Sequence, residues 1–203
     1  MNTIRSVCVY CGSSPGHDAT YAKAGHLLGR SIAKSGLRLI YGGGTRGIMG
    51  AVAEGALRAG GKVTGIIPRF LINREATETA LDRLDELVIT DNMHERKHSM
   101  FEKSDAFVAL PGGIGTVEEI IEIMTWAQLG HHRTPIVFGN VGGFWDPMLA
   151  LLDHMMAEGF IHTAQRVKPL VVEDPEAIVA AIMVAGSSVD APTEGVQSLI
   201  DTL

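Results

Sequence analysis

Seven short runs rich in apolar and β-branched residues alternate along the chain with longer segments of helical periodicity. Several runs are apolar at both odd and even positions, which is typical of strands that are covered by helices on both faces. This alternation predicts an α/β fold: a doubly wound parallel sheet, Rossmann-like, with helices on both faces. The predicted strands are "SVCVYCG", "LRLIYGG", "KVTGIIP", "ELVITD", "AFVALPGG", "PIVFGN" and "PLVVE", and the predicted helices cover residues 19–35, 48–59, 92–103, 116–128, 145–158 and 175–185.

Three glycine-bearing turns follow predicted strands: "CGSSPG", "YGGGTRGIMG" and "LPGGIGT". In a doubly wound sheet the ligand lies beyond the carboxyl ends of the strands, so these turns are expected to converge on one site. Glycine lets the backbone approach a phosphate closely, and a helix that starts there adds its dipole. The sequence therefore predicts a phosphorylated ligand at this edge.

Composition sets the limits of this interpretation. The chain has 203 residues, 46% of them hydrophobic, and a net charge of −6, which argues against a surface that coats nucleic acid. No run is apolar enough for a signal peptide or a membrane span, so we expect a cytoplasmic protein without membrane partners. Residues 1–185 are expected to form one nucleotide-binding domain and residues 186–203 a C-terminal tail.

Cys8 and Cys11 lie in a strand on opposite faces, which favours buried structural cysteines over a redox pair.

Two motifs suggest other chemistries. "GGGTRG" has dinucleotide-binding spacing, but Pro68 and Arg69 stand where an acidic residue should hold the ribose, which leaves only an NADP site open. "HERKH" matches the zinc motif H-E-x-x-H, with His94 and His98 as ligands. It begins directly after a strand, however, where Asn92 and Glu95 form a plausible helix cap. Both motifs remain minor alternatives.

The helix after "LPGG" carries unusual charge for a phosphate site. Thr116 and Glu119 fit a capping box, Thr-x-x-Glu. Capping does not explain Glu118 and Glu122, like charges four residues apart on one helix face. Carboxylates beside a phosphate site suit a ribose, because loss of a base from C1′ leaves an oxocarbenium-like sugar that they can stabilise.

Four ordered blocks identify a family. "VCVYCGSSPG", "YGGGTRGIMG", "MHERK" and "PGGIGTVEE" resemble the LOG (lonely guy) family, often labelled lysine decarboxylases. The resemblance implies a Rossmann-like homodimer that hydrolyses the N-glycosidic bond of N6-modified AMP. It implies release of the free base and ribose 5-phosphate with no metal and no redox cofactor. A pyridoxal-dependent decarboxylase would need a Schiff-base lysine, which the sequence does not mark.

The resemblance also implies roles for individual residues. Arg96 and Glu119 would be catalytic: Glu119 would stabilise the cation and activate water, and Arg96 would orient phosphate or ribose or assist the departing base. A binding glutamate precedes the "MHERK" block in the family, and Glu78 is preferred here over Glu75. The other implied substrate contacts are Gly43, Gly44, Lys97, Gly112, Gly113, Ile114, Gly115, Thr116, Val117, Glu118 and Thr125.

Two further functions fit the same residues. One is a general AMP nucleosidase that does not require an N6 substituent. The other is a non-catalytic nucleotide-binding or carrier module, since fold alone does not specify function. Replacing Glu119 would separate a catalyst from a binder.

Overall fold

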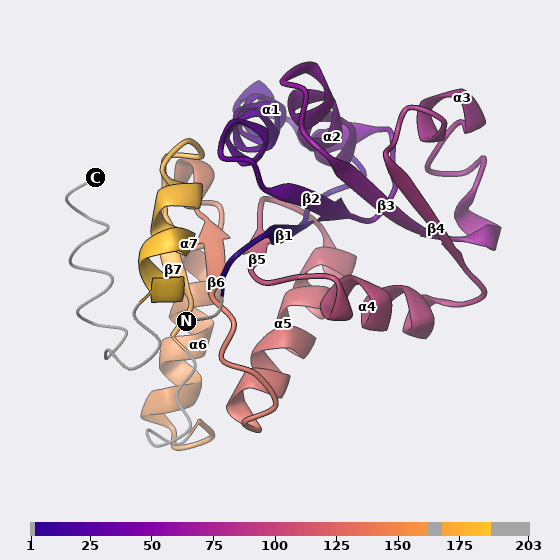
Figure 1. The fold of residues 1–203 in the computed structure, drawn as a ribbon. Helices are drawn as coiled ribbons and strands as arrows, with labels where there is room; N and C mark the ends of the chain where they lie inside the picture. The colour runs from indigo at the N-terminus through magenta and orange to yellow at the C-terminus, as the bar shows by residue number, and fades with distance from the viewer. Residues whose placement is uncertain (1–2, 162–167, 188–203) are drawn as a thin grey trace.

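A computed structural model of the chain describes residues 3–161 and 168–187. They form one seven-stranded, all-parallel sheet in the order β4-β3-β2-β1-β5-β6-β7 (Figure 1). All seven predicted strands and the predicted fold class are confirmed. The strands are β1 (Ser6–Tyr10), β2 (Arg38–Tyr41), β3 (Val63–Pro68), β4 (Glu86–Thr90), β5 (Phe107–Ala109), β6 (Ile136–Gly139) and β7 (Leu170–Val172).

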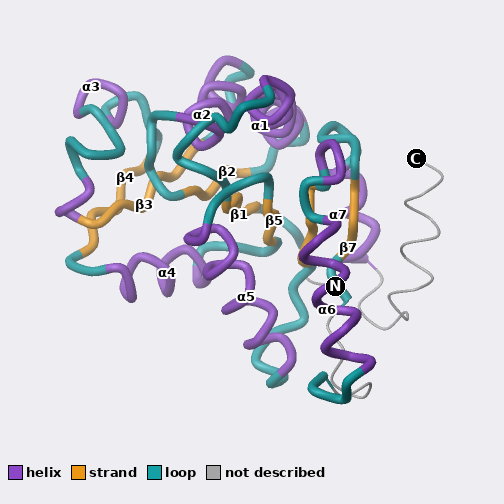
Figure 2. The backbone as a smooth tube through the Cα atoms, turned by 180° about the vertical axis from the view of Figure 1, so that it is seen from behind, coloured by secondary structure: helices purple, strands orange, loops and turns teal. Residues whose placement is uncertain are grey.

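Helices cover both faces of the sheet. In Figure 1, α1 and α2 lie above it and α4 and α5 below it, and the view from behind in Figure 2 shows α4 and α5 side by side. One apolar cluster packs α1, α2 and α7 on one face, and a second packs α4, α5 and α6 on the other. The helices are α1 (Ala19–Lys34), α2 (Gly47–Arg58), α3 (Glu78–Leu81), α4 (Met93–Glu102), α5 (Ile114–Gln128), α6 (Asp146–Ala157) and α7 (Ile178–Ser187), with short 3₁₀ turns η1 (Arg69–Leu71) and η2 (Val141–Gly143).

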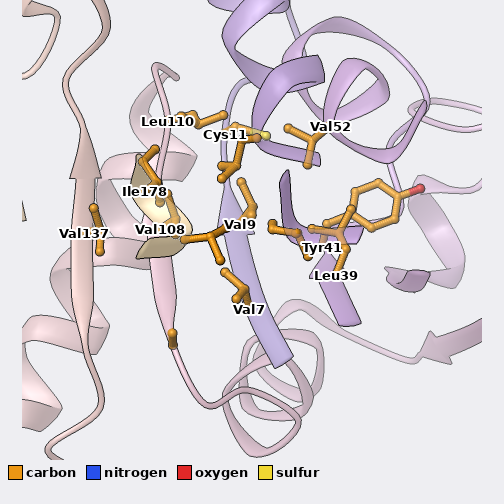
Figure 3. Packing of buried hydrophobic residues seen from close by; sticks show 14 of the residues in the cluster. Val7, Val9, Cys11, Leu39, Tyr41, Val52, Val108, Leu110, Val137 and Ile178 are labelled. Carbon is orange, nitrogen blue, oxygen red and sulfur yellow. The ribbon is translucent and has the colours of Figure 1, made fainter. Parts of the chain in front are cut away.

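Strand β1 shows how the sequence divides between the two cores. Val7, Val9 and Cys11 point into the cluster under α1 and α2 (Figure 3), while Cys8 and Tyr10 belong to the cluster over α4 and α5. This division follows from the two-residue period of a strand. Both cysteines are free and buried, as predicted, and burial raises the pKa of each thiol.

The strand order places a topological switch beside β1. The chain runs outward from β1 through β2 and β3 to β4, then crosses back to lay β5 on the other side of β1. In an open α/β sheet, ligands bind beyond the carboxyl ends of the strands at such a switch point, so the loops after β1 and β5 are where a site is expected. Within the described residues, no helix has the length and apolarity to cross a bilayer. Helix α7 extends to Ser187; the rest of the expected tail, residues 188–203, lies outside the described residues.

Candidate active site

The three glycine turns meet beyond the carboxyl ends of the strands, as predicted. The Gly12 N–H donates to the Pro111 carbonyl at 3.0 Å, which joins the turn after β1 to the turn after β5. The Gly12 carbonyl accepts from the N–H groups of Ile48 and Met49, at 3.1 and 3.2 Å, which joins the first turn to the start of α2. Two of the backbone N–H groups that the N-terminus of α2 leaves free are therefore already bonded within the protein.

The N-terminus of α5 is different, because its donors are open. Its first residues follow Gly113, which is extended and offers no side-chain cap. Within the described part of the chain, the N–H groups of Ile114, Gly115 and Thr116 have no acceptor. A Cβ added at Gly113 or Gly115 would meet nothing within 4 Å. Free donors, the helix dipole and open space together make this the better of the two helix ends for a phosphate.

The capping-box prediction is wrong. Helix α5 begins at Ile114 rather than after Thr116, so Thr116 lies inside the first turn and cannot cap it. Glu119 therefore does not cap the helix N-terminus. Its side chain faces the sheet and is only 11% exposed. Its Oε1 lies 3.7 Å from Nη1 of Arg96, so the structure brings the two predicted catalytic residues together.

Arg96 reaches Glu119 from α4, which is capped as predicted. The Asn92 side chain accepts from the Glu95 N–H at 2.9 Å, and the Glu95 carboxylate accepts from the Asn92 amide and the Asp91 N–H. Glu95 is therefore committed to the cap rather than to a metal. His94 and His98 are exposed on α4, and within the described ranges no three His, Cys, Asp or Glu side chains are grouped as a metal site requires. The zinc alternative has no support in this geometry.

The Arg96 guanidinium is buried and held by backbone carbonyls. Its Nε donates to the Ile66 carbonyl at 3.1 Å and its Nη2 to the Gly42 carbonyl at 3.0 Å. These are neutral partners, and the side chain is only 7% exposed. The cation is thus fixed across β2 and β3 and presents Nη1 to Glu119.

Burial controls the protonation of Glu119. Loss of solvent raises the pKa of this carboxyl from 4.5 to about 7, against the opposing pull of the Arg96 charge. The neighbouring Glu118 charge raises it as well, and so, more weakly, does Glu75. A carboxyl with this pKa can hold or release a proton near neutral pH, which is what a general acid or base requires.

Lys97 explains the pair of like charges on α5. Its ammonium group lies between Glu118 and Glu122, bonded to both, and its distance to Glu122 is 3.1 Å. Glu118 and Glu122 are therefore joined by a shared cation from α4, a contact that the sequence pattern does not indicate. Burial lowers the pKa of Lys97, but the hydrogen bonds that its ammonium donates to the two carboxylates outweigh burial, and the net pKa is raised.

The remaining predicted contacts are less uniform. Thr125 is exposed and its hydroxyl donates to the Ile121 carbonyl of its own helix, at 2.7 Å. Gly43 and Gly44 follow β2 beside the site, and a Cβ on them would meet Ile67 and Met49 respectively. Glu78 begins α3, and its side chain lies outside what the structure describes.

Two groups of the site were not among the predicted residues. One is the carbonyl of Ile66, a backbone atom that no residue pattern marks. The other is Gly42, the first glycine after β2; the family resemblance implies roles for Gly43 and Gly44 but none for Gly42. Glu75, the alternative to Glu78, lies near enough for its charge to act on Glu119, and its carbonyl accepts from the Thr45 N–H at 2.9 Å.

Comparison with known proteins places the chain in a family. A family model described as a possible lysine decarboxylase matches residues 49–182. A cytokinin riboside 5′-monophosphate phosphoribohydrolase of Rhodococcoides fascians is 44% identical over 180 residues, which cover 89% of this chain and 90% of that protein. The cytokinin riboside 5′-monophosphate phosphoribohydrolase LOG of Oryza sativa subsp. japonica is 43% identical over 173 residues, 85% of this chain and 69% of that protein.

A solved structure shares the fold at lower identity. The Moco carrier protein from Chlamydomonas reinhardtii has a TM-score of 0.66 and 22% identity, covering 91% of this chain and 99% of its own. At that identity the likeness concerns the fold alone. The two relatives match most of this chain at more than 40% identity, and the family model matches more than half of it. The chain therefore belongs to the LOG family, the family whose model is described as a possible lysine decarboxylase.

Proposed function

We propose that the chain hydrolyses the N-glycosidic bond of N6-modified adenosine 5′-monophosphates and releases the free base and ribose 5-phosphate. The observation that carries the proposal is the buried Arg96–Glu119 pair, with 3.7 Å between its closest charged atoms. Glu119 lies on α5, the helix whose open N-terminus suits a phosphate, and Arg96 reaches it from α4. The names of the relatives support the same reaction. The donors at Ile114, Gly115 and Thr116 would bind the 5′-phosphate.

Glu119 performs the central step in this proposal. In its ionised form it faces the positive charge that develops at C1′ as the bond to the base breaks. The electron pair of the broken bond leaves with the base, which takes up a proton from solvent. A water then bonds to C1′ and passes a proton to the Glu119 carboxylate, which returns it to solvent before the next turnover. With a pKa of about 7, Glu119 is both sufficiently ionised to stabilise the cation and basic enough to accept the proton.

Arg96 acts by holding a fixed charge rather than by reaching for the phosphate. Two of its nitrogens are bonded to strand carbonyls, so the side chain has little freedom to swing toward the α5 N-terminus. Its charge keeps part of the Glu119 population ionised, because it lowers a pKa that burial raises. This proposed role differs from those that the family resemblance implies for Arg96, which are to orient phosphate or ribose or to assist the departing base.

Lys97 does not fit the decarboxylase description. A lysine that forms a Schiff base is activated by a lowered pKa. Lys97 has a raised pKa and is bonded to two carboxylates. It serves here to hold α4 and α5 together and to keep Glu118 at the mouth of the site.

The functional unit in this proposal is a homodimer. Ile114 is 90% exposed on the first turn of α5, directly beside the proposed phosphate donors, and Met93 is exposed at the start of α4. An apolar side chain so exposed at a binding site is explained if a second copy covers it. An Ile114→Arg variant should sediment as a monomer and lose base release, whereas Leu151→Arg, at an exposed apolar position on α6, should change neither. A cytoplasmic location and the absence of nucleic-acid partners stay predictions.

Product analysis tests the proposed reaction. The protein is incubated with AMP, isopentenyladenosine 5′-monophosphate and the unphosphorylated riboside, with EDTA present throughout. We expect free base and ribose 5-phosphate from the modified monophosphate and nothing from the riboside. Equal rates from AMP would indicate a general AMP nucleosidase, and loss of activity with EDTA would indicate a metal-dependent hydrolase. Binding of AMP without release of base from any nucleotide would indicate a carrier module and contradict the proposal.

A further inference from the structure

We propose that Gly42 is a positioning residue for the reaction: its carbonyl and its missing side chain together hold the Arg96 guanidinium against Glu119. The inference rests on the proposed function and assigns a role to a residue outside the predicted set. Gly42 follows β2 directly, and its carbonyl accepts from Arg96 Nη2 at 3.0 Å. The Ile66 carbonyl of the neighbouring strand β3 accepts from Nε at 3.1 Å, so two adjacent strands clamp one cation.

The absence of a side chain at Gly42 matters to Arg96 as much as the Gly42 carbonyl does. A Cβ added there would overlap Nη2 of Arg96 and lie 3.1 Å from its Cζ. The next nearest atom is Sδ of Met49, at 3.3 Å. Gly42 does not have the positive φ of Gly43, so an alanine can adopt its backbone conformation. The conflict is therefore between one methyl group and the guanidinium, and not a matter of backbone strain.

The surroundings of Arg96 leave it little room to yield. Its Nη1 is already 3.8 Å from Sδ of Met93 and 3.7 Å from Glu119, and its Nε is bonded to Ile66. A methyl on Gly42 must push the guanidinium away from at least one strand carbonyl and change its position relative to Glu119. The Arg96 charge is the larger of the two charges that lower the pKa of Glu119, the other being the Lys97 ammonium from the same helix. Displacing the Arg96 charge weakens this effect while Lys97 stays in place, so the pKa of Glu119 should rise.

The test is Gly42→Ala, with Gly139→Ala as the matched control. Gly139 is also buried at the carboxyl end of a strand, and its added methyl meets the side-chain ends of Leu110 and Ile178 rather than the catalytic pair. An opposite charge near a carboxyl changes its pKa by about one to three units, so a rise of one to two units lowers turnover about five- to fifty-fold at pH 7. We expect turnover of Gly42→Ala to recover toward pH 9 with KM nearly unchanged, and Gly139→Ala to keep the wild-type pH profile.

A double-mutant cycle distinguishes positioning from a general loss of structure. Lysine lacks the Nη2 group that the methyl would strike, so Gly42→Ala should change the turnover of an Arg96→Lys variant less than about twofold. If Gly42→Ala alone fails to fold, the double variant should still unfold near the temperature of Arg96→Lys. Equal losses in both backgrounds, or a loss that is the same at every pH, would overturn the proposal.

One readout does not depend on the reaction. The pKa of Glu119 can be followed by carbon NMR of protein labelled in glutamate side chains, with Glu119→Gln to assign the signal. We expect the Glu119 titration to move upward in Gly42→Ala and to stay in place in Gly139→Ala. If the wild-type protein released no base but this titration moved, the reaction would be wrong and the positioning role would stand. An unmoved titration in Gly42→Ala would refute the positioning role.

Discussion

Replacing Glu119 by glutamine should stabilise the folded protein while removing its proposed activity. Glu119 is buried beside Arg96, and its pKa is about 7 instead of 4.5 because burial disfavours the charged form. The folded state therefore binds this proton more tightly than the unfolded state does. Glutamine mimics the protonated carboxyl and never becomes charged, so the variant avoids the cost of ionising a buried group.

The sign and size follow from proton linkage. The wild-type protein is most stable with respect to this group below pH 4.5, loses stability as the pH rises toward 7, and changes little above that. Each pH unit between the two pKa values corresponds to about 1.4 kcal/mol, which makes the full loss roughly 3 kcal/mol. Glu119→Gln should thus exceed wild type by roughly 3 kcal/mol in unfolding free energy at pH 8 and by less than about 1 kcal/mol at pH 5.

Urea unfolding at pH 5 and pH 8 measures this difference. The control is Glu102→Gln, which changes an exposed carboxylate on α4 and should stay within about 0.5 kcal/mol of wild type at both values. A Glu119→Gln variant that is less stable than wild type at pH 8 would refute the reasoning. A difference that is the same at both pH values would refute it equally, because the effect would then not arise from ionisation.

Three further predictions concern the rest of the site. Lys97→Met leaves two carboxylates of α5 facing each other without a cation and should lower the unfolding free energy by about 1 kcal/mol; high salt should reduce this loss, and a salt-independent loss would point to packing instead. Gly115→Ala should keep the wild-type melting temperature but raise KM, because its methyl enters open space beside the phosphate donors. Gly112→Ala should instead have a lower melting temperature, because its methyl would lie 2.7 Å from Cβ of Thr116 on α5. If the binding acid is Glu78, Glu78→Gln should raise KM more than Glu75→Gln does; the reverse order, measured on the same substrate, would assign the role to Glu75.

The sheet was predictable because each of its strands is a short apolar run in the sequence. A strand buried on both faces reads as a continuous apolar run, as in "SVCVY" and "PIVFG", and the seven runs became the seven strands. The alternation within β1 also assigned Cys8 and Cys11 to opposite faces correctly. These features depend on neighbours in the sequence, which is why they could be read from it.

The start of α5 was misplaced because two local patterns compete there. Thr116 and Glu119 have capping-box spacing, yet the helix begins at Ile114, where an extended Gly113 precedes it without a side-chain cap. Propensity alone does not favour a helix that starts with Ile-Gly. The burial of Glu119 against the sheet, which no local pattern contains, goes with the earlier start.

Long-range contacts account for the rest of what the sequence left open. The glycine turns before α2 and α5 both suit a phosphate by sequence, but the Gly12 carbonyl occupies two donors of α2, and the space beside Gly113 and Gly115 at α5 is open. Lys97 joins Glu118 and Glu122 from another helix, and Arg96 reaches a carbonyl 54 residues away, at Gly42. Such pairings are set by how the helices pack on the sheet, and sequence spacing does not encode them.

The measurement that tests the central claim most directly compares wild type and Glu119→Gln on one nucleotide. The affinity of the variant for isopentenyladenosine 5′-monophosphate is measured calorimetrically at pH 8 and compared with the KM of the wild-type protein, and both proteins are assayed for free base. A catalytic Glu119 predicts that the variant binds the nucleotide with an affinity close to that of wild type and releases at least about a hundredfold less base. Base release at the wild-type rate by a variant that binds normally would contradict the role of Glu119 and, with it, the proposed mechanism.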